Sequence, residues 1–307
     1  MPPEPRDADL LLLRHVAEHR VLEFSQLAFL AHRNLKATGR RLNELLAMGL
    51  VHLDDRGYGS GRGRPSKLVS LSETAVNQLK RRGILAKDVP GEKVLAGKLS
   101  NVEHQLLVNW SRLHLVQLER TLPNLTVKFL APTSPFLGSV GDGRPLVHEM
   151  APRVDTPSDQ HLFIPDGIFL VTESAEEKRP GLLFYLEVDL DTEALASRTR
   201  AANDIREKVL AYQAYFRNEG FKRYEQVWGC PLNGFRLLFL ANAPSRKTAL
   251  CRLVRDMMPS DFIWIADQTE MLNRGLTAAI WARGGRDTEP TQSILGPSLA
   301  RDTPINP

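Results

Sequence analysis

Cysteine is scarce in this 307-residue chain, and its scarcity excludes several classes of protein. Cys230 and Cys251 are too few for a disulfide framework, and no metal-ligand spacing surrounds either of them. A reducing cytoplasm is therefore the predicted compartment. No uninterrupted apolar run approaches the ~18 residues that a membrane-spanning helix needs. Acidic residues precede the first apolar run, so neither a membrane partner nor a signal peptide is expected.

Several catalytic motifs are also missing. The chain has no Walker A motif, no glycine-rich dinucleotide loop and no serine or cysteine nucleophile constellation. Net charge is small, at +4, but it is unevenly spread. Residues 1–100 hold 17 Lys/Arg and 11 Asp/Glu, giving +6, whereas the remainder holds 23 and 25, giving −2. The excess positive charge favours a polyanion partner for the first part of the chain only.

This basic part contains a recognisable order of elements. An apolar helix over residues 26–31 and a short turn precede a second helix over residues 35–48. Gly49 ends that helix, because glycine tolerates the positive φ of a helix C-terminus. Two strand-like runs follow, over residues 50–53 and 67–71. Helix, turn, helix and hairpin predict a winged helix-turn-helix that binds double-stranded DNA, with the second helix in the major groove.

The second helix has two contrasting faces. Its spacing places Leu35, Leu42, Leu45 and Leu46 on the side that faces a core. The other side carries side chains that can meet phosphates and base edges, namely Lys36, Thr38, Arg40, Arg41 and Asn43. The alternative interpretation is an ordinary solvated helix face.

The loop between the two strands adds a second DNA-binding signal. Arg62-Gly63-Arg64-Pro65 matches the core of an AT-hook, whose two arginines enter a narrow minor groove. Lys67 follows at the start of the second strand. A glycine- and arginine-rich loop is often only a soluble turn, but its place at the tip of a wing favours DNA contact.

The composition predicts four segments. Residues 1–83 form the winged helix-turn-helix domain, ending with a helix capped by Ser72. Residues 84–100 are a linker. Residues 101–283 form an α/β sandwich with a sheet of mixed direction, in the order α-β-β-β-α-β-α-β. Residues 284–307 are polar and contain prolines, so a disordered tail is expected.

Within the sandwich, three elements matter for function. A strand over residues 161–171 is interrupted at Pro165, a buried strand covers residues 182–190, and one long helix covers residues 193–218. The buried strand contains Glu187 and Asp189, which share one face because they lie two residues apart. Buried charge is costly unless it is compensated. Asp166 is expected nearby, and three converging carboxylates can hold a divalent cation.

These residues resemble the core of the PD-(D/E)XK nuclease superfamily. Pro165-Asp166, then about twenty residues of hairpin, then Glu187-Val188-Asp189 carry the resemblance. It implies a restriction-endonuclease-like core in which Asp166, Glu187 and Asp189 bind Mg²⁺ or Mn²⁺. The position of the superfamily's catalytic lysine is occupied by Asp189. The resemblance implies Lys208, on the following helix, as the replacement, with Tyr212 in a Lys-x-x-x-Tyr spacing.

Taken whole, the chain resembles the replication-relaxation family of plasmid and mobile-element proteins. The motifs are Gly-Leu-Val at 49–51, EHQLLVN at 103–109 and EVDLDTE at 187–193. The resemblance implies an N-terminal winged helix joined to a nuclease-like domain. It also implies a DNA-binding accessory role in replication, relaxation or mobilisation of extrachromosomal DNA, without proven catalysis.

Three functions remain open from the sequence. In the first, the protein binds duplex DNA without a cofactor, and a degenerate second domain supports a homodimer, a second DNA contact or a replication or mobilisation partner. Its carboxylates would then pair with arginines such as Arg198, Arg200 or Arg206. In the second, the protein is a Mg²⁺-dependent endonuclease. The third is a transcriptional repressor with a ligand-sensing second domain.

Overall fold

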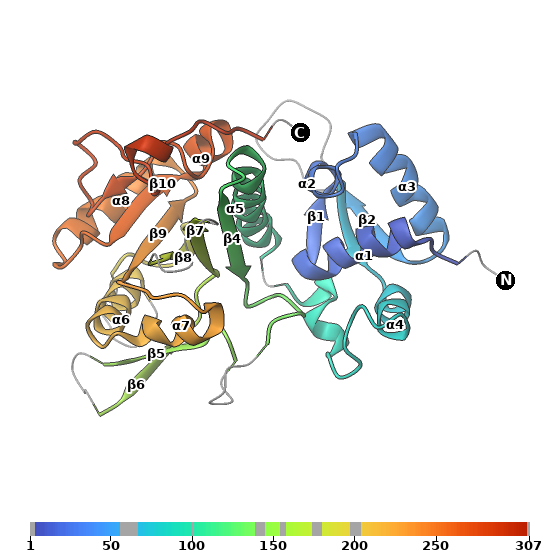
Figure 1. Ribbon diagram of the computed structural model, residues 1–307, viewed down its shortest axis with the longest axis horizontal. Coiled ribbons are helices and arrows are strands. Elements are labelled where there is room, and N and C mark those ends of the chain that lie inside the picture. The colour runs from blue at the N-terminus through green and yellow to red at the C-terminus, as the bar shows by residue number, and fades with distance from the viewer. Residues whose placement is uncertain are drawn as a thin grey trace. The chain divides into compact units, whose positions relative to one another are not determined.

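The chain divides into two compact units. The first comprises Met1–Leu113 with Thr133–Leu137, and the second comprises His114–Pro132 with Gly138–Ile305. Figure 1 shows both units, which are described separately below. The computed structural model describes residues 4–55, 67–99, 101–138, 145–153, 158–173, 180–196 and 204–305. Across those ranges, no helix combines the length and apolar character that crossing a membrane requires.

The first unit packs helices around a three-stranded antiparallel sheet with the order β1-β3-β2. A helix, a turn, a second helix and two paired strands follow one another along the chain, as the sequence predicts. The bounds are α1 (Asp7–His19), β1 (Val21–Glu23), α2 (Phe24–Leu30), α3 (Leu35–Ala47), β2 (Val51–Asp55), β3 (Lys67–Leu71) and α4 (Glu73–Arg81).

Both ends of α3 are fixed by local hydrogen bonds. The side chain of Asn34 accepts a hydrogen bond from the backbone N–H of Ala37 at 2.8 Å, which satisfies one of the free donors of the first turn. At the other end, Gly49 adopts φ +68° and the Leu50 N–H donates to the Leu45 carbonyl at 3.0 Å. This left-handed glycine cap is the one that the sequence predicts.

The expected linker over residues 84–100 is in fact part of the first unit. Leu85 and Val94 are buried in its core. Short 3₁₀ turns at Gly91–Lys93 and Ala96–Lys98 lead into α5 (Val102–Thr121). A linker interpretation fails because scattered apolar residues in a polar stretch are enough to dock it onto a nearby core.

The second unit is built on a six-stranded sheet with the order β11-β10-β9-β8-β7-β4. Strands β8, β9 and β10 are parallel to one another, whereas β4, β7 and β11 run antiparallel to their neighbours. The strands are β4 (Leu125–Leu130), β7 (Gly167–Glu173), β8 (Leu182–Asp189), β9 (Phe235–Ala241), β10 (Ile263–Asp267) and β11 (Ala282–Arg283). This is the mixed sheet of an α+β fold.

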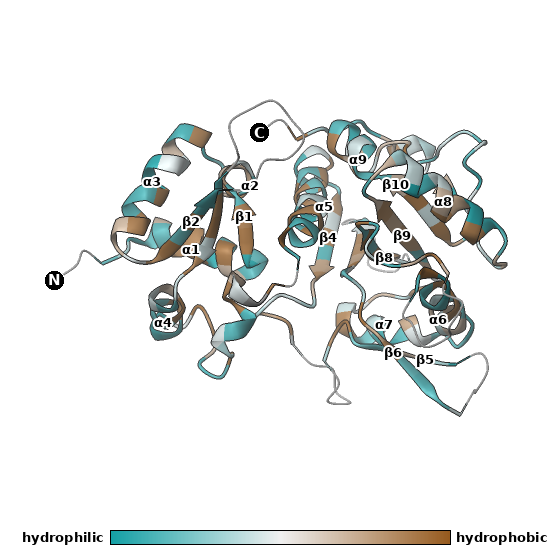
Figure 2. Ribbon diagram, turned by 180° about the vertical axis from the view of Figure 1, so that it is seen from behind, coloured by the Kyte–Doolittle hydropathy of each residue, from teal (hydrophilic) through white to brown (hydrophobic). Residues whose placement is uncertain are grey.

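Helices and a small hairpin complete this unit. Figure 2 shows the strongly apolar character of the central strand β9 beside more polar helices. Helix α8 packs on β9 and β10, and α6 packs against the separate hairpin β5-β6. The bounds are β5 (Glu149–Pro152), β6 (Gln160–Phe163), α6 (Ile205–Arg217), α7 (Arg223–Trp228), α8 (Pro244–Arg255) and α9 (Gln268–Arg274).

Two predicted elements are wrong in extent. The interrupted strand over residues 161–171 is two strands in two different sheets, β6 and β7, because the chain bends at Pro165. The helix predicted over residues 193–218 begins only at Ile205, where the side chain of Asp204 accepts from the Glu207 N–H at 2.9 Å. Glu193 therefore lies in an irregular segment before the helix.

The predicted disordered tail is also wrong for residues 284–305, which fold onto the second unit. The backbones of Trp281 and Gln292 exchange two hydrogen bonds, at 3.1 and 2.9 Å. Ile294 is fully buried. Polar composition misled the prediction because a few buried side chains anchor an otherwise polar segment.

Ile294→Ala tests the packing of this segment. Because the side chain is fully buried, the substitution should lower the free energy of unfolding by about 2–5 kcal/mol, measured by urea denaturation. The exposed Ser298→Ala should leave stability nearly unchanged. Equal stability of the two variants would contradict the buried position of Ile294.

Candidate functional site

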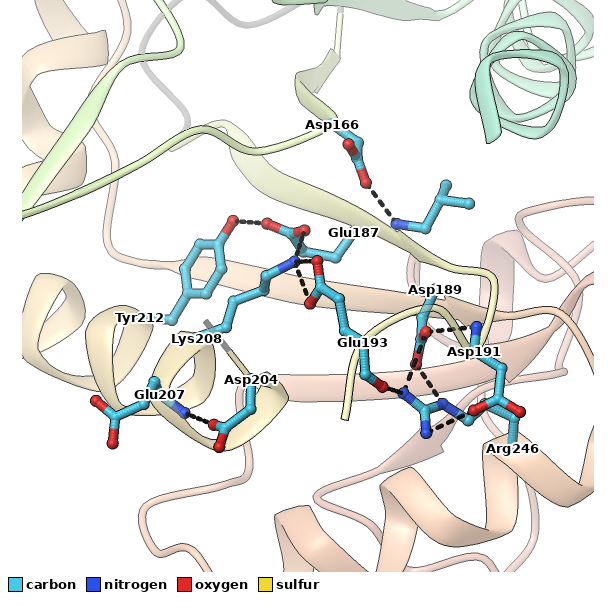
Figure 3. Close-up of polar contacts among 11 residues, drawn as sticks. Asp166, Glu187, Asp189, Asp191, Glu193, Asp204, Glu207, Lys208, Tyr212 and Arg246 are labelled. Atoms are coloured by element: carbon cyan, nitrogen blue, oxygen red, sulfur yellow. Dashed lines mark hydrogen bonds and ion pairs between the residues drawn. The ribbon is translucent and has the colours of Figure 1, made fainter. Parts of the chain in front are cut away.

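The acidic residues singled out from the sequence lie around the last residues of β8. Tyr185, Glu187 and Asp189 alternate along the strand and therefore share one face of the sheet. Helices α6 and α8 supply the side chains that meet this face, as Figure 3 shows. Glu187 and Asp189 are both buried, at 3% and 5% exposure, so each needs a compensating partner.

Glu187 receives two hydrogen bonds from α6. The Lys208 ammonium donates to Glu187 Oε2 at 3.1 Å, and the Tyr212 hydroxyl donates to Oε1 at 2.5 Å. The Lys208 side chain therefore points back to the sheet, which is the condition for it to stand in for the superfamily's lysine (Figure 3). Lys208 also contacts the carboxylate of Glu193 at 3.2 Å. One ammonium thus lies between two carboxylates.

The environment of this pair shifts both pKa values. Burial raises the pKa of Glu187 to about 7, the charge of Lys208 opposes this rise, and the charge of Asp166 adds to it. Burial lowers the pKa of Lys208, but the charges of Glu187 and Glu193 outweigh burial and hold it above its ordinary value. Lys208 therefore stays positively charged at neutral pH, while Glu187 titrates there.

Asp166 lies at the start of β7, next to β8. Its carboxylate accepts a hydrogen bond from the Val188 N–H at 2.8 Å, and its own N–H donates to the Leu186 carbonyl at 3.1 Å. These bonds fix the aspartate between the ends of two antiparallel strands. Asp166 and Glu187 are close enough for the charge of one to raise the pKa of the other.

Asp189 is engaged by a residue that the sequence did not single out. Arg246 of α8 donates to both of its carboxylate oxygens, at 2.7 and 3.3 Å. The same guanidinium contacts Asp191 at 2.8 Å and the Glu193 carbonyl at 2.6 Å. The sequence predicted that Asp166, Glu187 and Asp189 converge on one metal ion. In the structure, Asp189 is instead turned to Arg246. Among the described residues, no group of three His, Cys, Asp or Glu has a geometry that could hold a metal ion.

Of the arginines expected to pair with these carboxylates, Arg206 is exposed, and Arg198 and Arg200 lie outside the described residues. Arg246 is separated from Asp189 by 57 positions. The one sequence feature that could have pointed to this pair is an arginine on the helix that follows β9. Each of the two buried carboxylates, Glu187 and Asp189, therefore has a cationic partner. A cation bound by Asp166 and Glu187 would have to compete with the Lys208 ammonium.

The proposed DNA-reading face of α3 is smaller than predicted. Lys36, Arg40 and Asn43 are exposed, but Thr38 is fully buried and donates its hydroxyl hydrogen bond to the Asn34 carbonyl at 3.1 Å. Arg41 is mostly buried and forms ion pairs with Asp9 and Glu44. Thr38 and Arg41 therefore stabilise the unit from within.

Two predicted core leucines lie on the surface. Leu35 and Leu46 are 49% and 44% exposed, whereas Leu42 and Leu45 are fully buried as predicted. The buried stripe of α3 is thus narrower than the apolar pattern suggested. In the hairpin, Lys67 is half-buried at the start of β3, and Arg62 and Arg64 lie outside the described residues.

Comparison with known proteins decides the family. The model of the replication-relaxation family matches residues 13–229, more than half of the chain. The chain belongs to the replication-relaxation family. No curated protein matches it.

This family member has a weak structural likeness to a MarR family transcriptional regulator from Silicibacter pomeroyi. The two chains share 21% identity with a TM-score of 0.23. The match covers 32% of the replication-relaxation chain and 62% of the regulator.

Glu187→Gln tests the buried carboxyl. The folded-state pKa of about 7 lies above the ordinary value of 4.5, so the folded protein holds this proton more tightly than the unfolded chain. The stabilising effect is complete below pH 4.5 and disappears as pH rises through 7. The unfolding free energy of wild type minus that of Glu187→Gln should therefore fall over this interval by up to about 3 kcal/mol.

The measurement is urea denaturation of both proteins across this pH range. Glu270→Gln, which removes a carboxylate paired with Lys247 on α8, is the control and should keep the wild-type pH dependence. A wild-type advantage that is constant or grows with pH would contradict the raised pKa.

Proposed function

We propose that this replication-relaxation protein is a DNA-binding accessory protein that acts in replication, relaxation or mobilisation of plasmid or other mobile DNA. Its first unit serves as a winged helix-turn-helix that holds duplex DNA. The exposed polar face of α3 carries this proposal, because it presents Lys36, Arg40 and Asn43 to solvent while Leu42 and Leu45 fix the helix to the core.

The connectivity of the first unit supports this assignment. Helices α2 and α3 are joined by a short turn, and β2 and β3 pair in register from Val51↔Leu71 to Asp55↔Lys67. Such a unit places its second helix in the major groove and the hairpin against the backbone or minor groove. The +6 charge of residues 1–100 supplies the long-range attraction to phosphate.

The ion pairs divide the basic residues of α3 by role. Arg41 is committed to Asp9 and Glu44, so its guanidinium is occupied. Arg40, one position away, lies about 100° around the helix axis from Arg41 and is exposed. A bidentate contact with guanine therefore falls to Arg40, and Lys36 and Asn43 add phosphate or base-edge contacts.

The second unit is proposed as a nuclease-like domain that has lost catalysis. Strands β4, β7 and β8 form an antiparallel meander and β9 is the parallel partner of β8, which supports likeness to the PD-(D/E)XK core. The engagement of Asp189 by Arg246 supports loss of metal binding. The unit then offers a folded platform for self-association or for a replication or mobilisation partner.

Arg40→Ala tests the DNA-reading helix. If Arg40 contacts a base, its loss should weaken specific duplex binding by ~1–3 kcal/mol, measured by fluorescence anisotropy on the target duplex selected from a random pool. Lys36→Ala should weaken binding to all duplexes and reduce the salt slope by ~1. Arg81→Ala removes an equally exposed cation from α4 and is the matched control.

Arg41→Ala separates the two roles on this helix. Loss of the ion pair with the buried Asp9 should lower stability rather than remove a base contact. Wild-type affinity of Arg40→Ala, or absence of duplex binding at low ionic strength, would refute the major-groove assignment.

A second candidate function is a Mg²⁺- or Mn²⁺-dependent endonuclease. The observation that favours it is the approach of Lys208 to Glu187, which matches a lysine displaced onto the following helix. Supercoiled plasmid incubated with the protein and either metal decides between the two. The accessory role predicts intact plasmid in both cases. Nicking that disappears in Glu187→Ala but persists in Glu270→Ala would establish the nuclease instead.

A further inference from the structure

A cavity of about 390 Å³ opens in the second unit at the end of the sheet where the parallel strands β8, β9 and β10 begin. It lies at the opposite end of β8 from Glu187. Leu182 at the cavity and Glu187 at the acidic site are separated by five residue steps, or roughly 16 Å of strand. The cavity is therefore a separate feature with its own chemistry.

Aromatic rings form much of its wall. Phe216 and Phe262 are half-buried and stack with ring centroids 4.9 Å apart. Phe184 and Trp264 lie behind them at 0% and 4% exposure, so Phe216 and Phe262 offer the accessible ring surface. A cavity of this size with several rings fits a small planar ligand, since ring faces stack readily on a flat aromatic group.

Two arginines stand beside the same indole. The guanidinium carbon of Arg236 lies 5.1 Å from the Trp264 ring centroid, and that of Arg283 lies 5.9 Å from it. Both residues line the cavity. Burial lowers the pKa of Arg236, and the positive charge of Arg283 lowers it further. Two positive charges beside one indole favour an anion at this cavity.

The described carboxylates do not balance these charges. Among the residues that the structure describes, Arg236 has no carboxylate partner, and its guanidinium donates to the Ile294 carbonyl. Asp261 pairs with Arg283 at 3.7 Å, but it also pairs with Arg286 at 2.9 Å. Arg286 also pairs with Glu289 at 3.2 Å, so Arg236 is the cation at the cavity that no described carboxylate neutralises.

From the stacked rings and the arginine pair, we infer that this cavity binds a nucleotide, with the base against the aromatic wall and the phosphate between Arg236 and Arg283. Arginine is suited to both parts, because its planar guanidinium stacks on rings and donates bidentate hydrogen bonds to phosphate. The nucleotide can be a free monophosphate or the 5′-phosphorylated end of a single strand. The inference does not depend on duplex binding by the first unit.

Isothermal titration calorimetry of the full chain with thymidine 5′-monophosphate tests the inference. We expect saturable one-to-one binding. Thymidine and inorganic phosphate should each bind at least about tenfold more weakly, because each lacks one half of the recognised ligand. Absence of monophosphate binding, or equal binding of thymidine, overturns the inference.

Variants of the arginine pair locate the bound phosphate. Arg283→Gln should weaken monophosphate binding about tenfold. Asp261→Asn should strengthen it, because the competing carboxylate is lost. Arg255→Gln is the control: it removes an exposed arginine of the same unit that does not line the cavity, and it should keep the wild-type affinity. Wild-type affinity of Arg283→Gln, with an unchanged melting temperature, overturns the inference.

The test also separates this site from the DNA-binding helix. Arg40→Ala should lose duplex affinity and keep monophosphate affinity, and Arg283→Gln should show the reverse. On the Lys36→Ala/Arg40→Ala background, tighter binding of 5′-phosphorylated thymidine trinucleotide than of the monophosphate identifies a strand end as the ligand. Equal or weaker binding of the trinucleotide identifies a free nucleotide.

Discussion

The burial of the Glu187 carboxylate constrains how the helices of the second unit pack on its sheet. Glu187 sits in a central strand, where an isolated charge would be too costly to bury. Lys208 and Tyr212 compensate it from one turn of α6, and that helix must therefore lie against β8 in one register. The same two contacts hold the Glu187 carboxylate in one orientation, because each of its oxygens accepts a hydrogen bond from a different residue of α6.

The first unit distributes its charges in a comparable way. The adjacent arginines of α3 lie in different environments, because Arg41 pairs with the buried Asp9 while Arg40 is exposed to solvent. The neutralised cation secures the helix, and the exposed one remains available to a polyanion. Helical geometry alone produces this division, since neighbouring residues are about 100° apart around the axis.

Secondary structure set by neighbouring residues could be predicted from the sequence, whereas contacts between residues far apart in the chain could not. The buried strand over residues 182–190 and the helix end at Gly49 follow from apolar composition and backbone preference within a few residues. The start of α6 was misplaced because the cap at Asp204 outweighs the helical composition before it. The pairing of Asp189 with Arg246 depends on a sheet that brings distant segments together. No local pattern carries that information.

Arg246 links three parts of the segment that leaves β8: the Asp189 carboxylate, the Asp191 carboxylate and the Glu193 carbonyl. By holding the Glu193 backbone, Arg246 positions the Glu193 side chain next to Lys208. The position of the Glu193 carboxylate beside the Lys208 ammonium therefore depends on an arginine that lies outside the acidic motif itself.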